Sequence, residues 1–180
     1  MQEARFHMVL EDSGVLAECS IQVLMEDEYA NIADGMFEQS FESSVVIART
    51  IIQSEALHEA FSELYDLPSA ATVDIVVSSS DDMNSPHDSS VCFSLRATSE
   101  TGSCEIDFQR ASNAFIEFHA TKSISSTFHL AVLQQAMQVL PHAVETFLRL
   151  NEQGFFSIQH MLVLGNKRAF IDALVCPDAV

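Results

Sequence analysis

The sequence predicts an α+β fold in which antiparallel sheets carry two helices on one face, preceded by a short β-hairpin. Most apolar segments are short and rich in β-branched residues, which favours strands. Only two segments space their apolar residues three and four apart, as amphipathic helices do. The order strand, helix and three strands then occurs twice, which indicates a supersecondary repeat.

Two β-rich runs flank Asp12-Ser13-Gly14 and predict a hairpin over 6–24. Residues 25–34 are acidic and lack periodicity, so we interpret them as a linker. From Met36 the pattern predicts strand again, and the β-branched run 44–52 is predicted as a strand rather than a helix. Further strands are predicted at 72–78, 91–98, 103–110, 115–121, 123–129, 144–150, 155–163 and 169–175.

The first helix is predicted to begin at Ser54 as its N-cap and to end before Pro68. Its apolar face would pack on the sheet, and the solvent face would carry carboxylates. The apolar residues are Leu57, Phe61 and Leu64, and the solvent-facing ones are Glu55, His58, Glu59, Ser62 and Glu63. The second helix is predicted over 131–140, stopped by Pro141, with Gln134, Gln135 and Gln138 among its outward side chains.

The chain carries 26 acidic against 8 basic residues and a net charge of −18. This balance excludes a nucleic-acid binder held by its own charge, because such binding needs Lys and Arg to displace counterions from phosphate. A hydrophobic content of 48 % argues against disorder. No apolar stretch is long enough to span a bilayer, and the N-terminus lacks a signal-peptide pattern. We therefore expect an intracellular protein with no membrane partner.

The cysteines are far apart in sequence, without the close pairs that bind zinc or form a redox motif. They are Cys19, Cys92, Cys104 and Cys176. We expect reduced, mostly buried thiols and no cofactor.

Three stretches carry a family resemblance: 51–64 (IIQSEALHEAFSEL), 154–161 (GFFSIQHM) and Cys176-Pro177-Asp178. In collinear order they resemble the Rad-one subunit of the nine-one-one DNA-damage checkpoint clamp, within the PCNA-like sliding clamps. The resemblance implies two similar domains joined by a connecting loop. Residues 1–24 would be a hairpin remnant of the N-terminal domain, 25–34 the interdomain connecting loop, and 35–180 the C-terminal clamp domain. On this interpretation most of the first domain would be absent from the sequence.

The resemblance implies a non-catalytic subunit of a heterotrimeric checkpoint clamp that encircles double-stranded DNA at damage sites in the nucleus. Its partners would be two other clamp subunits, a clamp loader, and checkpoint and repair clients. It also implies that each partner subunit continues an edge strand. One contact would involve Cys104, Ile106 and Phe108, and the opposite contact Ile21 and Val23.

The resemblance further implies a client-peptide pocket with Met161 and Phe170 at its floor and Cys176 and Pro177 at its rim. A simpler interpretation makes Met161 and Phe170 ordinary core residues. In a clamp ring the two helices would face DNA. The residues concerned, His58, Gln134, Gln135 and Gln138, lie among carboxylates and neutral amides, so enclosure or the partners' basic residues would have to hold DNA.

Two other functions stay open. Glu105 and Asp107 fall on one face of a predicted strand, as in a metal-dependent 3'-5' DNA exonuclease, although no spacing identifies the further acids that such a site needs. The loop residues Asp81, Asp82, His87 and Asp88 lack EF-hand spacing. A small acidic peptide-binding adaptor is the other alternative. Assembly with two clamp subunits would separate both from the clamp hypothesis.

Overall fold

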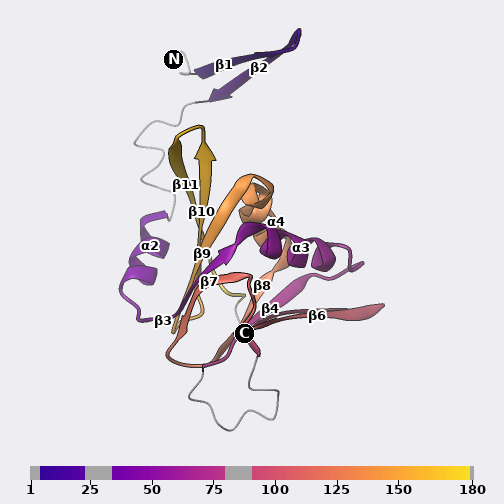
Figure 1. The fold of residues 1–180 in the computed structure, drawn as a ribbon, viewed down its shortest axis with the longest axis vertical. Helices are drawn as coiled ribbons and strands as arrows, with labels where there is room; N and C mark the ends of the chain where they lie inside the picture. Colours follow the sequence, from indigo (N-terminus) through magenta and orange to yellow (C-terminus); the bar gives the residue numbers. More distant parts are fainter. Residues whose placement is uncertain (1–4, 23–33, 80–90, 179–180) are drawn as a thin grey trace. The chain divides into compact units, whose positions relative to one another are not determined.

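The computed structural model describes residues 5–22, 34–79 and 91–178 (Figure 1). The chain divides into two compact units between Phe37 and Glu38, a hairpin unit and a larger α+β unit. Each is described separately. No helix in the described ranges is long and apolar enough to cross a membrane.

The first unit contains an antiparallel hairpin of β1 (Arg5–Asp12) and β2 (Val15–Gln22). Its turn places Ser13 at φ 49° and Gly14 at φ 82°, as a tight two-residue hairpin turn requires. The predicted hairpin and its turn are therefore confirmed. Cross-strand pairing puts apolar residues on one face, where Phe6 lies opposite Ile21 and Leu10 opposite Ala17. These large side chains are exposed, with Phe6 58 % accessible.

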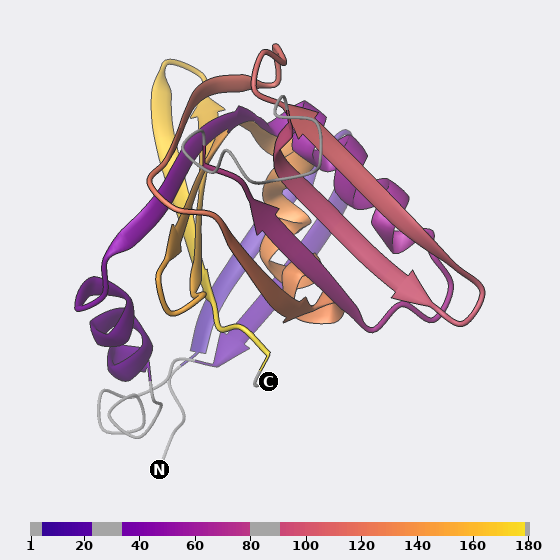
Figure 2. The same ribbon diagram turned by 90° about the horizontal axis from the view of Figure 1, so that it is seen from below.

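The larger unit has two antiparallel sheets. The five-stranded sheet has the order β11-β10-β9-β3-β7, and the four-stranded sheet has the order β6-β5-β4-β8 (Figure 2). The strands are β3 (Val46–Gln53), β4 (Thr72–Val77), β5 (Val91–Ser99), β6 (Gly102–Gln109), β7 (Phe115–Ala120), β8 (Ile124–His129), β9 (Ala143–Asn151), β10 (Phe156–Leu164) and β11 (Lys167–Val175).

The two predicted repeats exchange their first strands. The first repeat is β3, helix α3 (Ser54–Tyr65), β4, β5 and β6, and the second is β8, helix α4 (Leu130–Ala136), β9, β10 and β11. Strand β3 pairs with β9 of the second repeat, while β8 pairs with β4 of the first. Neither repeat can therefore complete its sheet alone, and both contribute strands to each sheet.

Helices α3 and α4 lie side by side and contact strands of both sheets (Figures 1 and 2). Leu57, Phe61 and Leu64 are buried on α3, as predicted. The predicted N-cap is wrong. Gln53 occupies that position, and Ser54 is the first helical residue, with its fully buried hydroxyl bonded to Thr146.

Two further predictions fail. A strand was predicted from Met36, but the chain forms helix α2 (Asp34–Glu42), which ends with Phe41 buried. The second helix was predicted to run to residue 140. Instead α4 ends at Ala136 and a 3₁₀ helix, η1 (Met137–His142), continues through Pro141. Proline is accepted there because a short terminal 3₁₀ turn does not need every N–H donor.

Aromatic contacts join the two sheets. Phe93 on β5, Phe108 on β6, Phe115 on β7 and Phe118 on β7 form a continuous series with ring centroids 5.6, 5.9 and 5.3 Å apart. Phe128 on β8 lies 5.7 Å from Phe156 on β10. These tilted ring pairs add to the apolar burial that holds the layers together.

Candidate functional site

Strand β6 forms one edge of the four-stranded sheet, and of the described strands only β5 pairs with it. The side chains predicted to contact a partner, Cys104, Ile106 and Phe108, point toward the domain's own core, where Phe108 is buried. The alternate residues of β6 are exposed. A partner strand added at this edge would therefore be held by backbone hydrogen bonds.

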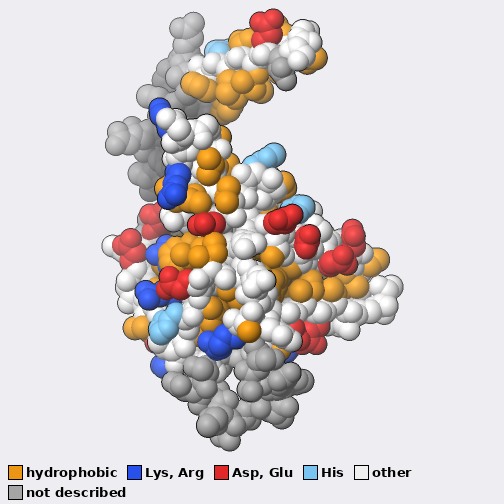
Figure 3. All heavy atoms as spheres, viewed as in Figure 1, with side chains coloured by type: hydrophobic (Ala, Val, Ile, Leu, Met, Phe, Trp, Pro, Cys, Tyr) orange, Lys and Arg blue, Asp and Glu red, His pale blue; other side chains and the backbone are white. Residues whose placement is uncertain are grey.

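The opposite predicted contact lies on β2, which pairs only with β1 in the part of the chain that is described. Ile21 is 55 % exposed on the apolar face of the hairpin, and Figure 3 shows hydrophobic side chains along this element. Val23 lies outside the described residues. An exposed apolar strand pair of this kind needs a covering partner to avoid aggregation.

The four predicted pocket residues separate into two places. Met161 on β10 and Phe170 on β11 are directly opposite each other, with Phe170 55 % exposed. Phe170 is therefore not a core residue, contrary to the simpler interpretation. Cys176 and Pro177 follow the far end of β11, six residues from Phe170, which is roughly 20 Å along a strand. Both are half-buried.

The rim residues lie against the β9–β10 turn and β8. The ring of Pro177 approaches the position that a Cβ atom on Gly154 would occupy, and the Asp178 amide donates to the Thr127 carbonyl at 2.7 Å. His129 Nε2 lies 3.3 Å from an Asp178 carboxylate oxygen. The segment after β11 is thus fixed to the domain.

The DNA-facing candidates are exposed, as predicted. His58 lies on α3, Gln134 and Gln135 on α4, and Gln138 on η1. Neither α3 nor α4 carries a Lys or Arg, and α3 exposes Glu55, Glu59 and Glu63. Figure 3 shows acidic and basic side chains interspersed on the face it presents, without an extended basic surface. This surface cannot attract phosphate by charge.

The carboxylates considered for catalysis are engaged in the structure. Glu105 lies 2.6 Å from Arg96 Nε, and the hydroxyl of Ser94 donates to Asp107 at 2.5 Å. No group of three or more His, Cys, Asp or Glu residues suited to a metal occurs among the described residues. The loop residues Asp81, Asp82, His87 and Asp88 lie outside the described residues.

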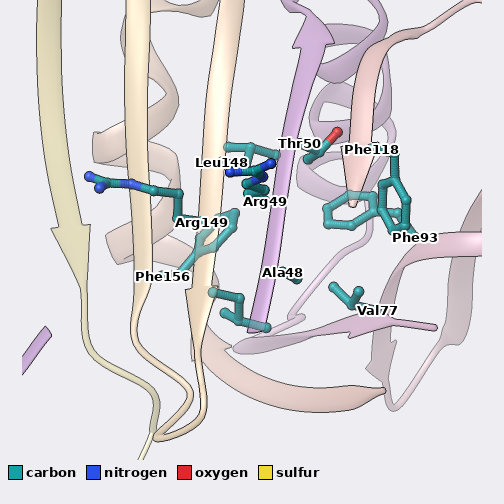
Figure 4. A pocket seen from close by; sticks show the side chains of 10 residues that line it. Ala48, Arg49, Thr50, Val77, Phe93, Phe118, Leu148, Arg149 and Phe156 are labelled. Carbon is teal, nitrogen blue, oxygen red and sulfur yellow. The ribbon is translucent and has the colours of Figure 1, made fainter. Parts of the chain in front are cut away.

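A small void lies between the two sheets (Figure 4). Its volume is about 10 Å³, at the lower limit for a single water, and its walls include Ala48, Val77, Phe93 and Phe156. The void is a packing defect of the apolar core and not a ligand site.

The four cysteines are free thiols. Only Cys92 is fully buried, whereas Cys19 is exposed and the other two are half-buried, so the prediction of mostly buried thiols is wrong. Burial raises the pKa of the Cys92 thiol to about 11, although the nearby Arg110 opposes the shift. Burial also raises the pKa of Cys176.

The sequence did not single out a groove on the outer face of the five-stranded sheet. Its lining brings Arg49, His119, Phe147 and Arg149 together from three strands, and its volume is about 460 Å³. The basic residues look scattered in the sequence, and only the pairing of β3 with β9 and β7 gathers them.

Comparisons with known proteins agree with this architecture. The family model described as repair protein Rad1/Rec1/Rad17 matches residues 2–162. Cell cycle checkpoint protein RAD1 from Homo sapiens and from Mus musculus are each 27 % identical over 172 residues, covering 95 % of this chain and 55 % of the relative. The chain therefore spans about half the length of the curated relatives it matches.

A solved structure supports the fold. The crystal structure of the PCNA2-PCNA3 complex from Sulfolobus tokodaii matches with a TM-score of 0.65 and 11 % identity, covering 96 % of this chain and 60 % of that one. The predicted α+β clamp fold is thus confirmed. The chain belongs to the Rad1/Rec1/Rad17 family of repair proteins and has the PCNA-like fold of a sliding clamp.

Proposed function

We propose that this chain acts as a non-catalytic subunit of a heterotrimeric checkpoint clamp that works in the nucleus. The observation that supports it most is the outer edge of β6, which no described strand pairs with, on a PCNA-like domain of a Rad1-family protein. That edge would pair with a strand of one partner subunit. The β2 edge would serve a second partner, and the complex would encircle DNA after a clamp loader opens it.

The domain division belongs to the same proposal. Residues 1–24 act as the hairpin remnant of an N-terminal clamp domain, 25–34 as the connecting loop, and 35–180 as the C-terminal clamp domain. Most of the linker lies outside the described residues. The hairpin's exposed apolar face supports this assignment, because a two-stranded ribbon is only marginally stable without further sheet.

Assembly with the two other clamp subunits tests the proposal. Coexpression and pull-down should recover this chain stoichiometrically with at least the partner that pairs with β6. The double variant Ser103→Lys and Gln109→Lys places charge on exposed positions of that edge and should abolish this contact while the melting temperature stays unchanged. Gln135→Lys on α4 is a control of the same chemistry and should assemble normally. Absence of both partners from the pull-down of the wild-type chain would contradict the proposal.

DNA would be held by enclosure and not by the surface of this chain. The carboxylates of α3 and the neutral amides of α4 support this mode of DNA contact. The chain alone should show no nanomolar affinity for duplex DNA at physiological salt in a fluorescence anisotropy titration. Tight binding under those conditions would refute enclosure as the mode of contact.

Client proteins would dock on the outer surface, with Met161 and Phe170 as one contact and Cys176 and Pro177 as another. The exposure of Phe170 and its pairing with Met161 support the first contact. Because Phe170 lies within β11 and Cys176 follows the end of that strand, a client peptide would need to run along the strand to reach both pairs. Client affinity that is the same for wild type, Met161→Ala and Phe170→Ala would remove these residues from the docking surface.

A further inference from the structure

The outer face of the five-stranded sheet carries a row of two arginines and a histidine across neighbouring strands. Arg49 on β3 is directly opposite His119 on β7 and Arg149 on β9, and Arg149 is opposite Ser157 on β10. Neighbouring strands lie about 4.8 Å apart, so the row extends roughly 14 Å across the sheet. It contains two of the chain's 8 Lys and Arg residues and no carboxylate.

Placing two arginines directly opposite each other is unfavourable unless other groups compensate. Arg149 is stabilised by stacking, since its guanidinium carbon lies 5.1 Å from the ring centre of Phe41 and 5.5 Å from that of Phe147. One terminal nitrogen donates to Ser157 Oγ at 2.9 Å. Figure 4 shows the Arg149 side chain extending away from the core void and from Arg49.

Within the described ranges Arg149 has no anionic partner. No carboxylate of the described ranges lies within 4.0 Å of it, and its Nε–H is buried without an acceptor. In a chain with a charge of −18, an arginine that stays half-buried without a carboxylate is unusual. Held by Phe41, Phe147 and Ser157, the guanidinium is a fixed cation in the groove lining, which suits it to an incoming carboxylate.

Two acids on the neighbouring row of the same face are engaged. Glu117 lies 3.6 Å from Arg49, and both side chains are more than half exposed, so this ion pair is weak and easily exchanged. Asp172 accepts a hydrogen bond from Gln159 at 2.7 Å. The groove of about 460 Å³ also has apolar lining at Val46 and Phe147. Its chemistry therefore combines separated cationic groups with an apolar wall.

We propose that this groove binds an acidic peptide of a partner protein, in an extended conformation that crosses β7, β3 and β9. Carboxylates two residues apart on an extended chain are about 6.6 Å apart, which lets successive acidic side chains reach Arg49 and Arg149. The methylene groups of these acidic side chains would contact Phe147. The site does not depend on ring assembly, because all of its residues belong to the larger unit.

Fluorescence anisotropy with labelled octapeptides tests the proposal on the full chain. The probe alternates Glu and Val, and the control peptide replaces each Glu by Gln. The Glu peptide should bind, and the Gln peptide should bind at least about tenfold more weakly, because each charge-assisted hydrogen bond contributes about that factor. Equal binding of the two peptides would overturn the proposal.

Protein variants assign the binding to the row. Arg49→Gln and Arg149→Gln should each weaken the Glu peptide about tenfold, whereas Arg168→Gln, an equal charge change on β11 outside the groove, should not. Glu117→Gln should tighten binding by releasing Arg49. Equal losses at Arg49 and Arg168 would indicate unspecific attraction and refute the site. Arg49 is exposed, so its variant keeps the test valid even if Arg149→Gln unfolds.

Two further measurements distinguish an acidic peptide from other anions as the ligand of the groove. In an ¹H–¹⁵N spectrum the Arg149 Nε–H resonance should shift on adding the Glu peptide. A shift with inorganic phosphate but none with the peptide would show a site for small anions and overturn the peptide assignment. Binding of single-stranded oligothymidylate with the same dependence on Arg49 and Arg149, without peptide binding, would equally overturn it.

Discussion

The hydroxyl of Thr146 lies 3.0 Å from Nδ1 of His160, and both residues are fully buried. Nε2 of the same imidazole lies 3.0 Å from the Ala136 carbonyl, which can only accept, so Nε2 carries the proton. Nδ1 therefore accepts from Thr146, and Thr146 accepts from Ser54 at 2.8 Å. These hydrogen bonds form one continuous series, in which every donor is assigned, and the series joins the start of α3, two sheet strands and the end of α4.

The series makes stability depend on pH through His160. Burial lowers the pKa of His160, while the Ala136 carbonyl and the charge of Asp172 oppose the shift. In the unfolded chain the pKa of this histidine is about 6.5. Below that pH the unfolded chain binds a proton that the native state does not bind, so the free energy of unfolding falls as the pH decreases. The decrease should approach about 1.4 kcal/mol per pH unit between pH 6.5 and the lower native pKa. Urea unfolding at pH 5 to 8 measures it.

His160→Gln should flatten that pH dependence and destabilise the protein at pH 7.5, because an amide whose NH₂ group donates to Ala136 does not also place an acceptor at the position of Nδ1. The exposed His58→Gln variant is the control and should reproduce the wild-type profile. Parallel profiles for wild type and His160→Gln would show that His160 is not the titrating group.

Thr146→Val tests the hydroxyl itself at nearly constant volume. The change leaves Nδ1 of His160 without a donor and Ser54 without its acceptor, so we expect a loss of about 1–3 kcal/mol in the free energy of unfolding. Thr121→Val provides a matched change at an exposed threonine, and its effect should be smaller. Equal, small effects of both changes would mean that the buried series contributes little.

Of the glycines whose surroundings the structure describes, Gly154 is the one that the fold most requires. Its φ is +86°, and a Cβ atom there would lie 2.8 Å from Ser126 Oγ. Gly154→Ala should therefore destabilise by roughly 1–3 kcal/mol, from backbone strain and from the clash. Gly165 has a φ of +64° and open space around it, so Gly165→Ala should be destabilised by backbone strain alone. Gly102→Ala should be nearly neutral. Thermal melts that fail to follow this order would contradict the assignment.

Local patterns explain why much of the fold was predictable from sequence. The β-branched run at 44–52 and the spacing of Leu57, Phe61 and Leu64 specify a strand and a helix whatever surrounds them. The strand predicted from Met36 failed because Phe41 is buried from a helix, where one apolar contact outweighs weak β-propensity. Pro141 failed as a stop signal because 3₁₀ geometry tolerates it.

The candidate sites also differ in how far local sequence predicts them. Pairing of Met161 with Phe170 follows from the turn between β10 and β11, so a short-range pattern places both residues. The row of Arg49, His119 and Arg149 depends on strands far apart in the sequence, and nothing local encodes their order. Shifting β9 by one residue would move Arg149 to the opposite face. The interlocked repeats fix this register only in the folded domain.

Thiol reactivity gives a further prediction from burial. Alkylation with iodoacetamide at pH 8 should modify the exposed Cys19 first and leave the buried Cys92 unmodified, because the reactive thiolate of Cys92 is scarce at a pKa of about 11. The half-buried Cys104 and Cys176 should react at intermediate rates. Peptide mass spectrometry over time measures the order. Fast modification of Cys92 in the folded protein would mean that β5 opens readily.

Deleting residues 1–33 should leave the larger unit folded with an unchanged melting temperature. Its largest fully buried side chains, including Phe61, Phe93 and Phe156, all lie after residue 37, and the two units are separate in their contacts. Circular dichroism melting of the deletion variant and of the full chain gives the comparison. Phe61→Ala in either background should lower the free energy of unfolding by about 3–5 kcal/mol and marks the sensitivity of the assay. A large drop on deletion would mean that the hairpin unit packs on the domain and contributes to its core, which would also redefine the N-terminal contact proposed for a partner subunit.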